Sequence, residues 1–407
     1  MSLTLKRRSF VKGAAAVTAA GVFAPRLALG ADPISVGSLT PNTGGGGPFG
    51  PKITAAHKMI VDLVNENGGI LGREVALTQE NSETNPETAI RAARKLVDVN
   101  KVIGVLGTWS SSVTLGIMPL CQEANVIQMC TSSSADIPKK DAKGLVFNFQ
   151  ALSPVWGAAI ASLALRRGFK SYSVMALNND FTNSMVDTFV ERVKAEGAEV
   201  TGTPFYYNGG QASYRSEVEQ LIEGQPEAVF IPSYVTDFTA VYKEIFRSGY
   251  EGQVITVSIS TGSKFKEAVG EAANGILHGL PVPPLDSPAY KWYLDKVGLE
   301  DNGNVQHPFG TAGSDQMSVL LLAVESAGTD DVSEVKQHIR KVANPEGKNV
   351  TNVLDGLEAL RAGEVINYSG ASSAVDFNDD DGMIRSRDFQ LWEIKDGKDE
   401  TIERIQS

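Results

Sequence analysis

The chain of 407 residues contains only two cysteines and four histidines, and these shortages narrow the kinds of site it could hold. Two cysteines, Cys121 and Cys130, are too few for a disulfide framework. We expect two separate thiols, because a helix would carry Cys121 away from the strand that ends at Cys130. The histidines are scattered, and none has a cysteine at metal-ligand spacing: His57, His278, His307 and His338. We therefore expect no metal site built on them.

Signatures of catalysis and of calcium binding are also missing. The sequence has no G-x-S-x-G turn for a nucleophilic serine and no local cysteine–histidine signature. The acidic run 376–381 places oxygen ligands at alternate positions, as a calcium loop does. However, Asp381 stands where that loop needs glycine, and Arg387 stands where it needs glutamate. A hairpin turn is the better interpretation, and we expect no enzyme, metal or cofactor.

The first 30 residues have the features of an export signal. Arg7 and Arg8 precede an apolar stretch of about a dozen residues, and small residues offer a cleavage site after Gly30 or the next residue. Paired arginines before a weakly apolar core indicate twin-arginine export, although Lys6 and Val11 depart from the usual pattern. This stretch is too short to span a bilayer, as are all later apolar runs. The sequence therefore predicts a periplasmic protein without membrane insertion after cleavage.

The charge balance argues against nucleic acid as a partner. The whole chain carries a net charge of −11. Removal of residues 1–30 takes away five basic residues and no acid, which leaves 32 basic against 48 acidic residues and a net charge of −16. A strongly acidic protein binds nucleic acids and anionic membranes poorly. The expected partners are therefore small molecules and proteins.

The rest of the chain alternates short apolar strands with amphipathic helices, which predicts an α/β fold with mostly parallel sheets covered on both faces. The expected strands are 34–39, 75–80, 102–106, 126–130, 172–177, 200–206, 228–232, 254–257, 374–377 and 387–393. The expected helices are 51–64, 86–100, 112–124, 154–168, 182–196, 214–223, 238–248, 289–296, 316–327, 332–342 and 353–362.

This alternation of strands and helices predicts two α/β lobes joined by three crossings. Lobe 1 is expected over 31–150 and 282–363, and lobe 2 over 151–281 and 364–407. The crossings are expected near 150–153, 275–281 and 363–368. Two lobes with several crossings form a hinged clamp.

A glycine-rich turn follows the first strand. Residues 45–50 match the G-x-G-x-x-G pattern that binds dinucleotides, and Glu80 ends the second strand. Four consecutive glycines produce such a match easily, and Pro48 and Pro51 stiffen the turn. Glu80 also comes later than the pattern requires. Dinucleotide binding therefore stays an alternative rather than the main prediction.

Two serine clusters are the stronger signal. Ser110–Ser112 follows the strand 102–106, and Ser132–Ser134 follows the strand 126–130. Both positions lie at the carboxyl ends of parallel strands, where open α/β sheets bind ligands. Hydroxyls beside backbone N–H groups suit a small anion such as a carboxylate. Aromatic residues also stand where loops meet the expected cleft: Phe49, Trp109, Phe181 and Tyr234.

The order and spacing of several motifs resemble the type I periplasmic solute-binding proteins of branched-chain amino acid and amide ABC transporters. The motifs are the turn 65–73 (NENGGILGR), the segment 85–89 (NPETA), the serine turn 110–112, the segment 180–182 (DFT) and the closing segment from 370 to 382. The resemblance covers essentially the whole mature chain. It implies a two-lobed binding protein that captures a solute and delivers it to a permease.

The resemblance also implies roles for single residues. Ser111 matches a serine that contacts the ligand carboxylate, and Ser132 and Ser134 match a turn that contacts the backbone atoms of an amino acid. Phe49 matches an aromatic residue lining the pocket, with Trp109 beside the first serine turn. Phe181 and Tyr234 match aromatic residues of the second lobe that close over the ligand.

The residues put a plain α-amino acid ligand in doubt, while a branched-chain amino acid-like solute stays among the expected ligands, with amides and aromatic acids. Amino-acid binders of the family carry a glutamate for the ammonium group, whereas the corresponding stretch, residues 258–262, contains no acid. Ser260 is the candidate ligand-binding residue of this stretch. An unpaired buried ammonium is costly. A carboxylate or amide with an apolar or aromatic body fits at least as well. A monomer that serves an importer is expected; a ligand-sensing subunit of a receptor and an exported dinucleotide-dependent oxidoreductase are the alternatives.

Overall fold

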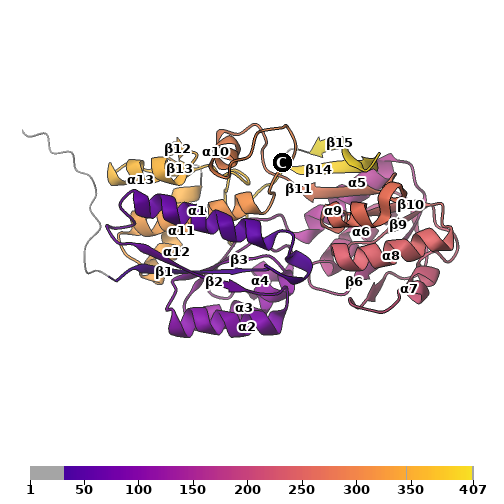
Figure 1. The fold of residues 1–407 in the computed structure, drawn as a ribbon, viewed down its shortest axis with the longest axis horizontal. Coiled ribbons are helices and arrows are strands. Elements are labelled where there is room, and N and C mark those ends of the chain that lie inside the picture. The colour runs from indigo at the N-terminus through magenta and orange to yellow at the C-terminus, as the bar shows by residue number, and fades with distance from the viewer. Residues whose placement is uncertain (1–31, 345, 406–407) are drawn as a thin grey trace, which may run out of the picture.

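The computed structural model describes residues 32–344 and 346–405. The predicted export signal over residues 1–30 lies outside the described residues. Two α/β lobes lie side by side along the long axis of the molecule (Figure 1). Within the described ranges, no helix is long and apolar enough to cross a membrane.

The first lobe is built on a five-stranded parallel sheet with the order β2-β1-β3-β4-β5. Its strands are β1 (Ile34–Thr40), β2 (Val75–Asn81), β3 (Gly104–Thr108), β4 (Ile127–Cys130) and β5 (Val146–Asn148). Its helices are α1 (Gly50–Glu66), α2 (Pro86–Arg94), α3 (Ser111–Glu123), α4 (Asp136–Lys140), α11 (Gly310–Ala327), α12 (Val332–Ala343) and α13 (Val353–Arg361). The short helical turns η1 (Gly44–Gly46) and η2 (Lys95–Val99) complete it.

Alternation along the strands explains why this sheet is covered on both faces. In β1, Val36 belongs to the hydrophobic cluster under α1, α11 and α12, whereas Leu39 belongs to the cluster under α2 and α3. Successive side chains of a strand point to opposite faces, so an apolar strand of this kind needs helices on both sides. The N-cap residue Asn85 accepts a hydrogen bond from Thr88 N at 3.0 Å and starts α2, as its Asn-Pro sequence predicts.

The second lobe is built on a mixed sheet with the order β15-β14-β11-β10-β9-β6-β7, and β8 pairs with β6. Its strands are β6 (Ser171–Leu177), β7 (Glu199–Val200), β8 (Phe205–Tyr207), β9 (Ala228–Phe230), β10 (Gln253–Val257), β11 (Leu277–Pro281), β14 (Phe389–Lys395) and β15 (Lys398–Ile405). Its helical segments are α5 (Ser153–Arg166), α6 (Asn183–Ala195), α7 (Arg215–Leu221), α8 (Val235–Ser248), α9 (Ser263–Val269), η3 (Ser258–Ser260) and η4 (Gly270–Ala273). Helix α10 (Pro288–Lys296) and the small sheet of β12 (Lys348–Val350) and β13 (Ile366–Tyr368) belong to the last third of the chain.

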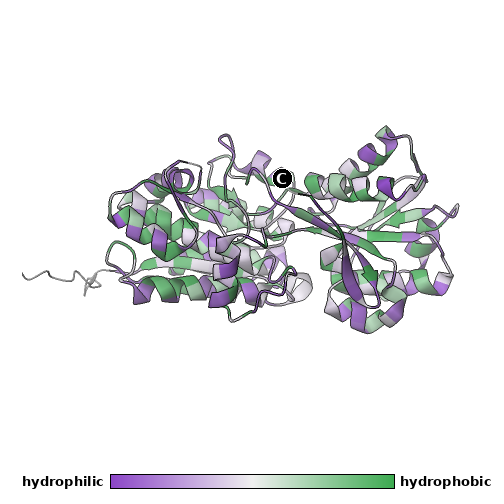
Figure 2. Ribbon diagram, turned by 90° about the horizontal axis from the view of Figure 1, so that it is seen from above, coloured by the Kyte–Doolittle hydropathy of each residue, from purple (hydrophilic) through white to green (hydrophobic). Residues whose placement is uncertain are grey.

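Helices on the outside of both lobes carry hydrophobic and hydrophilic residues side by side, as amphipathic helices do (Figure 2). The strands β14 and β15 form an antiparallel hairpin that adds the edge of the second sheet. In Figure 1 this yellow hairpin lies above the second lobe, beside β11. The last residues of the chain therefore complete the second sheet.

Two of the expected crossings need correction. The segment 275–281 is not a crossing, because it contains β11, which lies inside the second sheet between β10 and β14. The chain leaves that sheet at Val282, whose N–H donates to Asp388 O at 2.8 Å. The third crossing also comes later than 363–368, because β13, Phe377 and Ile384 pack with the core of the first lobe. Only from Phe389 onward does the chain join the second sheet.

A buried carboxylate explains why the segment 364–384 stays with the first lobe. Asp315, inside α11, is fully buried and accepts hydrogen bonds from Tyr368 Oη at 3.0 Å, Ala371 N at 2.8 Å and Ser372 N at 2.7 Å. A Cβ added to Gly370 would lie 2.4 Å from Asp315 Oδ2, so only glycine lets the turn approach the carboxylate this closely. The closing motif of the sequence thus binds an internal carboxylate.

Three further expectations concern the two cysteines, the acidic run and the strand before it. Cys121 and Cys130 are separate buried thiols, and burial raises the pKa of each to about 12. The acidic run forms a hairpin turn, in which Asn378 N donates to Met383 O and Phe377 pairs with Ile384. The expected strand 374–377 is reduced to that single bridge.

Candidate functional site

A small cavity lies between the two lobes, at the carboxyl ends of the strands of both sheets. Its volume is only about 10 Å³, room for about one water molecule, so the side chains of the two lobes nearly fill it. It is lined by Trp109, Thr131, Ser133, Trp156, Phe181, Tyr234, Ile259 and Phe309. In the first lobe, the lining follows β3 and β4; in the second, it follows β6, β9 and β10. This edge is where open α/β sheets bind ligands.

Five aromatic rings make most of the wall, and they form a continuous chain of contacts. The Trp156 and Phe181 ring centroids are 5.2 Å apart, and those of Phe181 and Tyr234 are 6.3 Å apart. Trp109 lies 5.1 Å from Tyr234 and 5.8 Å from Phe309. Because Trp109 belongs to the first lobe and Tyr234 to the second, the wall crosses the interface between the lobes.

Hydroxyl groups form the polar end of the cavity. Thr131 is 2% exposed, and its Oγ1 has no hydrogen-bond partner. Ser133 lies beside it on the same turn and is also buried. A buried hydroxyl without a partner is costly, so Thr131 is a natural contact for a polar group of a ligand. The amino end of α3 adjoins this turn, because Ser111 Oγ accepts from Ser133 N at 3.2 Å.

None of the eight residues that line the cavity carries a charged side chain. Burial raises the pKa of Tyr234 to about 12; a hydrogen bond from Ser110 lowers it, and the negative charge of Asp180 raises it. The hydroxyl of Tyr234 is therefore neutral at physiological pH. The walls offer ring faces and hydroxyls rather than an ion-pair partner.

The serines predicted to bind ligand do not line this cavity. Ser111 Oγ accepts from Ser133 N and from Ser134 N, at 3.2 and 3.1 Å. Ser132 Oγ lies 2.6 Å from Thr114 Oγ1 and donates to Trp109 O at 3.1 Å. Each of these hydroxyls is used inside the first lobe, where they hold the two turns together.

The other two predicted serines are engaged in the same way. Ser134 Oγ accepts from Asp136 N at 3.2 Å at the start of α4, and Ser260 Oγ donates to Ser233 O at 2.6 Å. Ser260 thereby fixes η3 to the turn that carries Tyr234. Its neighbour Ile259, not Ser260, reaches the cavity.

Three of the four predicted aromatic residues lie in the wall of the cavity. Trp109, Phe181 and Tyr234 all line the cavity. Phe49 lies one layer behind it, with its ring centroid 5.5 Å from Trp109 and 4.9 Å from Phe309. It supports two of the wall rings from the start of α1.

Sequence reasoning missed five lining residues: Thr131, Ser133, Trp156, Ile259 and Phe309. Ser133 stood inside a recognised cluster, but the pattern does not say which hydroxyl points outward. Trp156 lies in the first turn of α5, just after the first crossing, and Phe309 is the N-cap residue of α11. An aromatic residue at the start of a helix is the signal that could have found them.

The glycine-rich turn does not form a phosphate cradle. Residues 44–46 fold as η1, and the turn packs against the cavity wall: a Cβ on Gly46 would lie 2.8 Å from Trp109 Cε3. Ring atoms thus occupy the space that a dinucleotide would need beside these glycines.

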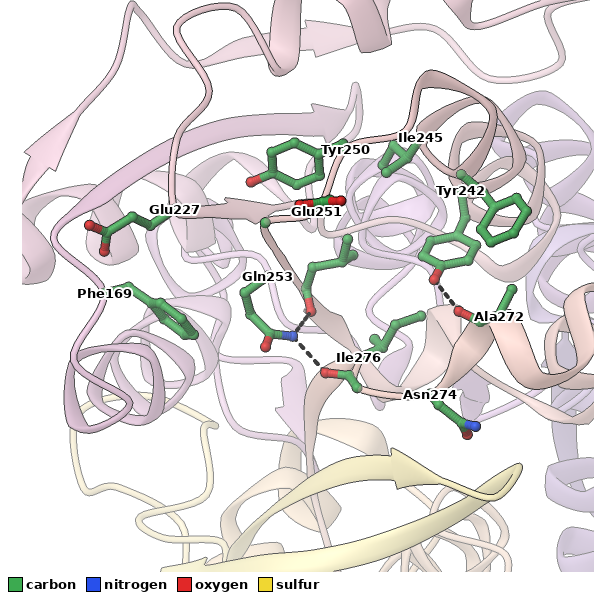
Figure 3. Close-up of a pocket in the computed structure, with 14 residues that line it drawn as sticks. Phe169, Glu227, Tyr242, Ile245, Tyr250, Glu251, Gln253, Ala272, Asn274 and Ile276 are labelled. Atoms are coloured by element: carbon green, nitrogen blue, oxygen red, sulfur yellow. Dashed lines mark hydrogen bonds between the residues drawn. The ribbon is translucent and has the colours of Figure 1, made fainter.

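A larger, open hollow lies elsewhere in the second lobe (Figure 3). It is formed at the amino ends of β9, β10 and β11, away from the lobe interface. Gln253 Nε2 donates to Val254 O at 2.9 Å and to Gly275 O at 2.6 Å, and Tyr242 Oη donates to Ala272 O (Figure 3). These polar groups are satisfied within the protein, so the inter-lobe cavity is the better candidate site.

Comparison with known proteins places the chain in a family. A family model described as periplasmic binding protein matches residues 33–398. A curated relative, the chemotactic signal transduction system substrate-binding protein BasB of Halobacterium salinarum, is 22% identical over 367 residues, which cover 84% of this chain and 83% of the relative.

Solved structures share the fold. A leucine-binding protein LivK from Thermotoga maritima aligns with a TM-score of 0.77 at 21% identity, over 92% of this chain and 99% of that one. A solute-binding protein of an ABC transporter from R. palustris, in complex with 4-hydroxybenzoate, aligns with a TM-score of 0.74 at 16% identity, over 92% and 97%. With the two-lobed fold and the cavity between the lobes, these matches confirm the predicted resemblance: the chain belongs to the periplasmic binding protein family.

Proposed function

We propose that the chain is the substrate-binding component of an ABC importer and that it works in the periplasm as a monomer. It captures a small solute between its lobes and delivers it to the permease. The solute carries a carboxylate or amide group on an apolar or aromatic body. Twin-arginine export, as the first 30 residues predict, would bring it there. The role is binding rather than catalysis.

One observation carries the proposal for the ligand: five aromatic rings and two hydroxyls line the cavity, and no charged side chain does. An α-amino acid would bring an ammonium group that finds no acid there, which is costly in a buried site. Aromatic rings bury large apolar area and pack edge to face or offset with a guest ring. The 4-hydroxybenzoate bound by the R. palustris protein has this chemistry, with one ring and one carboxylate.

The polar head of the ligand is placed at Thr131 and Ser133. Both hydroxyls can donate to a carboxylate or amide oxygen. The amino end of α3 lies against the same turn, through the contact of Ser111 with Ser133 N, and its partial positive charge favours an anion. The ring or alkyl body then lies among Trp156, Phe181 and Phe309.

The test is a thermal-shift screen of the mature protein against amino acids, amides, urea, aliphatic carboxylates and aromatic carboxylates. A ligand that binds only the folded form stabilises it by about 2.7 kcal/mol at a hundredfold excess over Kd. We expect aromatic or branched carboxylates, or amides, to shift the melting temperature. A shift with plain α-amino acids alone would contradict the proposed class.

A variant pair tests the placement of the polar head. Thr131→Val keeps the shape and removes the unpartnered hydroxyl, so affinity for the ligand that the screen finds should fall about tenfold. Thr188→Val, on α6, removes a hydroxyl that donates to Ser184 O and should leave affinity unchanged. Equal affinity of the Thr131 variant and wild type would reject this placement.

A sensing role is the second candidate, favoured by the chemotactic function named for the BasB relative. A binding protein can hand its closed form to a receptor instead of a permease. Uptake of radiolabelled ligand by cells with and without the gene separates the two. Uptake that depends on the gene supports import, and unchanged uptake with altered chemotaxis supports sensing.

A further inference from the structure

The glycine-rich turn of the first lobe lacks side chains at its glycines, and the second lobe packs directly against it. A Cβ added to Gly45 would lie 2.7 Å from Tyr234 Cδ2, 3.3 Å from Cγ and 3.4 Å from Cε2. All three atoms belong to one edge of the tyrosine ring. Gly45 lies in η1 of the first lobe, whereas Tyr234 starts α8 of the second. The contact therefore exists only while the lobes are together.

Aromatic rings of both lobes pack against the Tyr234 ring and restrict its movement. Its centroid is 5.1 Å from that of Trp109 and 6.3 Å from that of the nearly parallel Phe181 ring. The side chain of Ser110, the N-cap residue of α3 in the first lobe, lies near enough to the Tyr234 hydroxyl to lower its pKa. The ring of Tyr234 thus packs against two residues of the first lobe, Gly45 and Trp109.

The close contact with Tyr234 explains why position 45 is a glycine, whereas the backbone conformation at this position does not require one. Gly44 has a φ of +76°, but Gly45 is not among the residues with positive φ. Alanine can therefore adopt the backbone conformation of residue 45 without strain. The Cβ of alanine would, however, overlap with the Tyr234 ring.

We propose that Gly45 and Tyr234 form a latch that holds the lobes closed over the cavity. The proposal rests on the proposed function, since it concerns closure of the same site. Gly45 does not line the cavity, so it is a positioning residue. A contact made only in the closed form shifts the equilibrium toward closure, and a ligand then needs to supply less of that shift.

Distance measurements between spin labels test the latch without a ligand. Labels on cysteines introduced by Glu87→Cys on α2 and Ser216→Cys on α7, both exposed positions, report the separation of the lobes. The natural Cys121 and Cys130 are buried and stay unlabelled. We expect a closed population in the otherwise wild-type protein, and a closed-to-open ratio about tenfold lower with Gly45→Ala, because overpacking disfavours the closed form.

Gly262→Ala is the matched control. An added Cβ there meets nothing within 4 Å, and the residue has a φ of −58°. This variant should keep the wild-type distance distribution. The latch would be overturned if Gly45→Ala and wild type gave the same distance distribution. This includes the case in which both proteins are fully open.

The experiments distinguish failure of the latch from failure of the proposed solute-binding function. If the screen finds no ligand, the distance measurement still decides on the latch. If it finds one, Gly45→Ala should bind it about tenfold more weakly at an unchanged unfolding midpoint, and Gly262→Ala should bind it as wild type does. Unchanged affinity in Gly45→Ala would reject the latch and leave the solute-binding function standing.

Discussion

At the scale of a residue, Ser111 holds together the two turns beside the candidate cavity. Its side chain is 1% exposed, and its oxygen accepts from two backbone N–H groups, of Ser133 and Ser134. The turn that presents Ser133 and Thr131 to the cavity depends on this oxygen. Ser111 therefore shapes the site from behind.

Ser111→Ala should lower the free energy of unfolding by about 1–3 kcal/mol, because two buried N–H groups lose their acceptor. Urea titration measures this loss. Ser112→Ala, one residue along and only partly buried, is the control and should change stability by less than about 0.5 kcal/mol. If the Ser111 variant proved as stable as the control, the turn would not depend on this hydroxyl.

At the scale of elements, periodicity located most helices and strands but failed on short or interrupted ones. Strand β11 was missed because its sequence, LHGLP, contains glycine and proline and ends an irregular stretch. The expected strand 200–206 is two short strands, β7 and β8, which pair with different parts of β6. Helix α11 begins at Gly310, six residues before the expected 316, because small polar residues at its start hide the pattern.

The candidate site could be predicted only in part for a related reason. Residues directly after strand ends, such as Trp109 and Tyr234, were placed well because parallel strands end at one edge of a sheet. Trp156 and Phe309 come from helix starts that are far apart in the sequence and meet only when the lobes fold. The direction of a serine hydroxyl depends on its acceptors, which a sequence pattern does not contain.

Arg387 connects segments of the first and third crossings by hydrogen bonds. Arg387 is 4% exposed, and its guanidinium donates through Nη1 to Phe149 O and through Nη2 to Pro308 O, the latter at 3.0 Å. Phe149 belongs to the first crossing and Arg387 to the third, while Pro308 precedes α11. Burial lowers the pKa of Arg387 to about 10, and the group stays charged at neutral pH.

Arg387→Met should lower the free energy of unfolding by about 3 kcal/mol, because two buried carbonyl groups lose charged donors. Denaturant unfolding monitored by circular dichroism gives the value. Arg385→Met removes a neighbouring arginine that is 39% exposed and pairs with Asp379 at the surface. Its expected change is within about 0.5 kcal/mol, and an equal loss in both variants would argue against a special role for Arg387.

At the scale of the whole molecule, buried histidine makes stability depend on pH. His57 is fully buried in the first lobe, with Nδ1 2.8 Å from Ser38 Oγ and Nε2 3.4 Å from Gln316 Oε1. Burial lowers the pKa of His57 from 6.5 to about 4, and the hydrogen bond with Gln316 opposes this. Between these values the unfolded chain binds more protons than the folded protein. His57 thus leaves stability intact above pH 6.5 and reduces it as pH falls toward 4, by about 3 kcal/mol.

Comparison of His57→Gln with wild type separates the effect of His57 on the pH dependence of the free energy of unfolding from the effect of the carboxylates. The free energy of unfolding is measured by denaturant at pH 7, 6, 5 and 4 for both proteins. The variant should be less stable at pH 7, because it disturbs a packed polar group, but its loss between pH 7 and 4 should be smaller than that of wild type by about 3 kcal/mol. His338→Gln, at a partly buried site on α12, should keep nearly the wild-type slope. A His57 variant with the full wild-type slope would mean that the ring does not titrate differently in the folded and unfolded states.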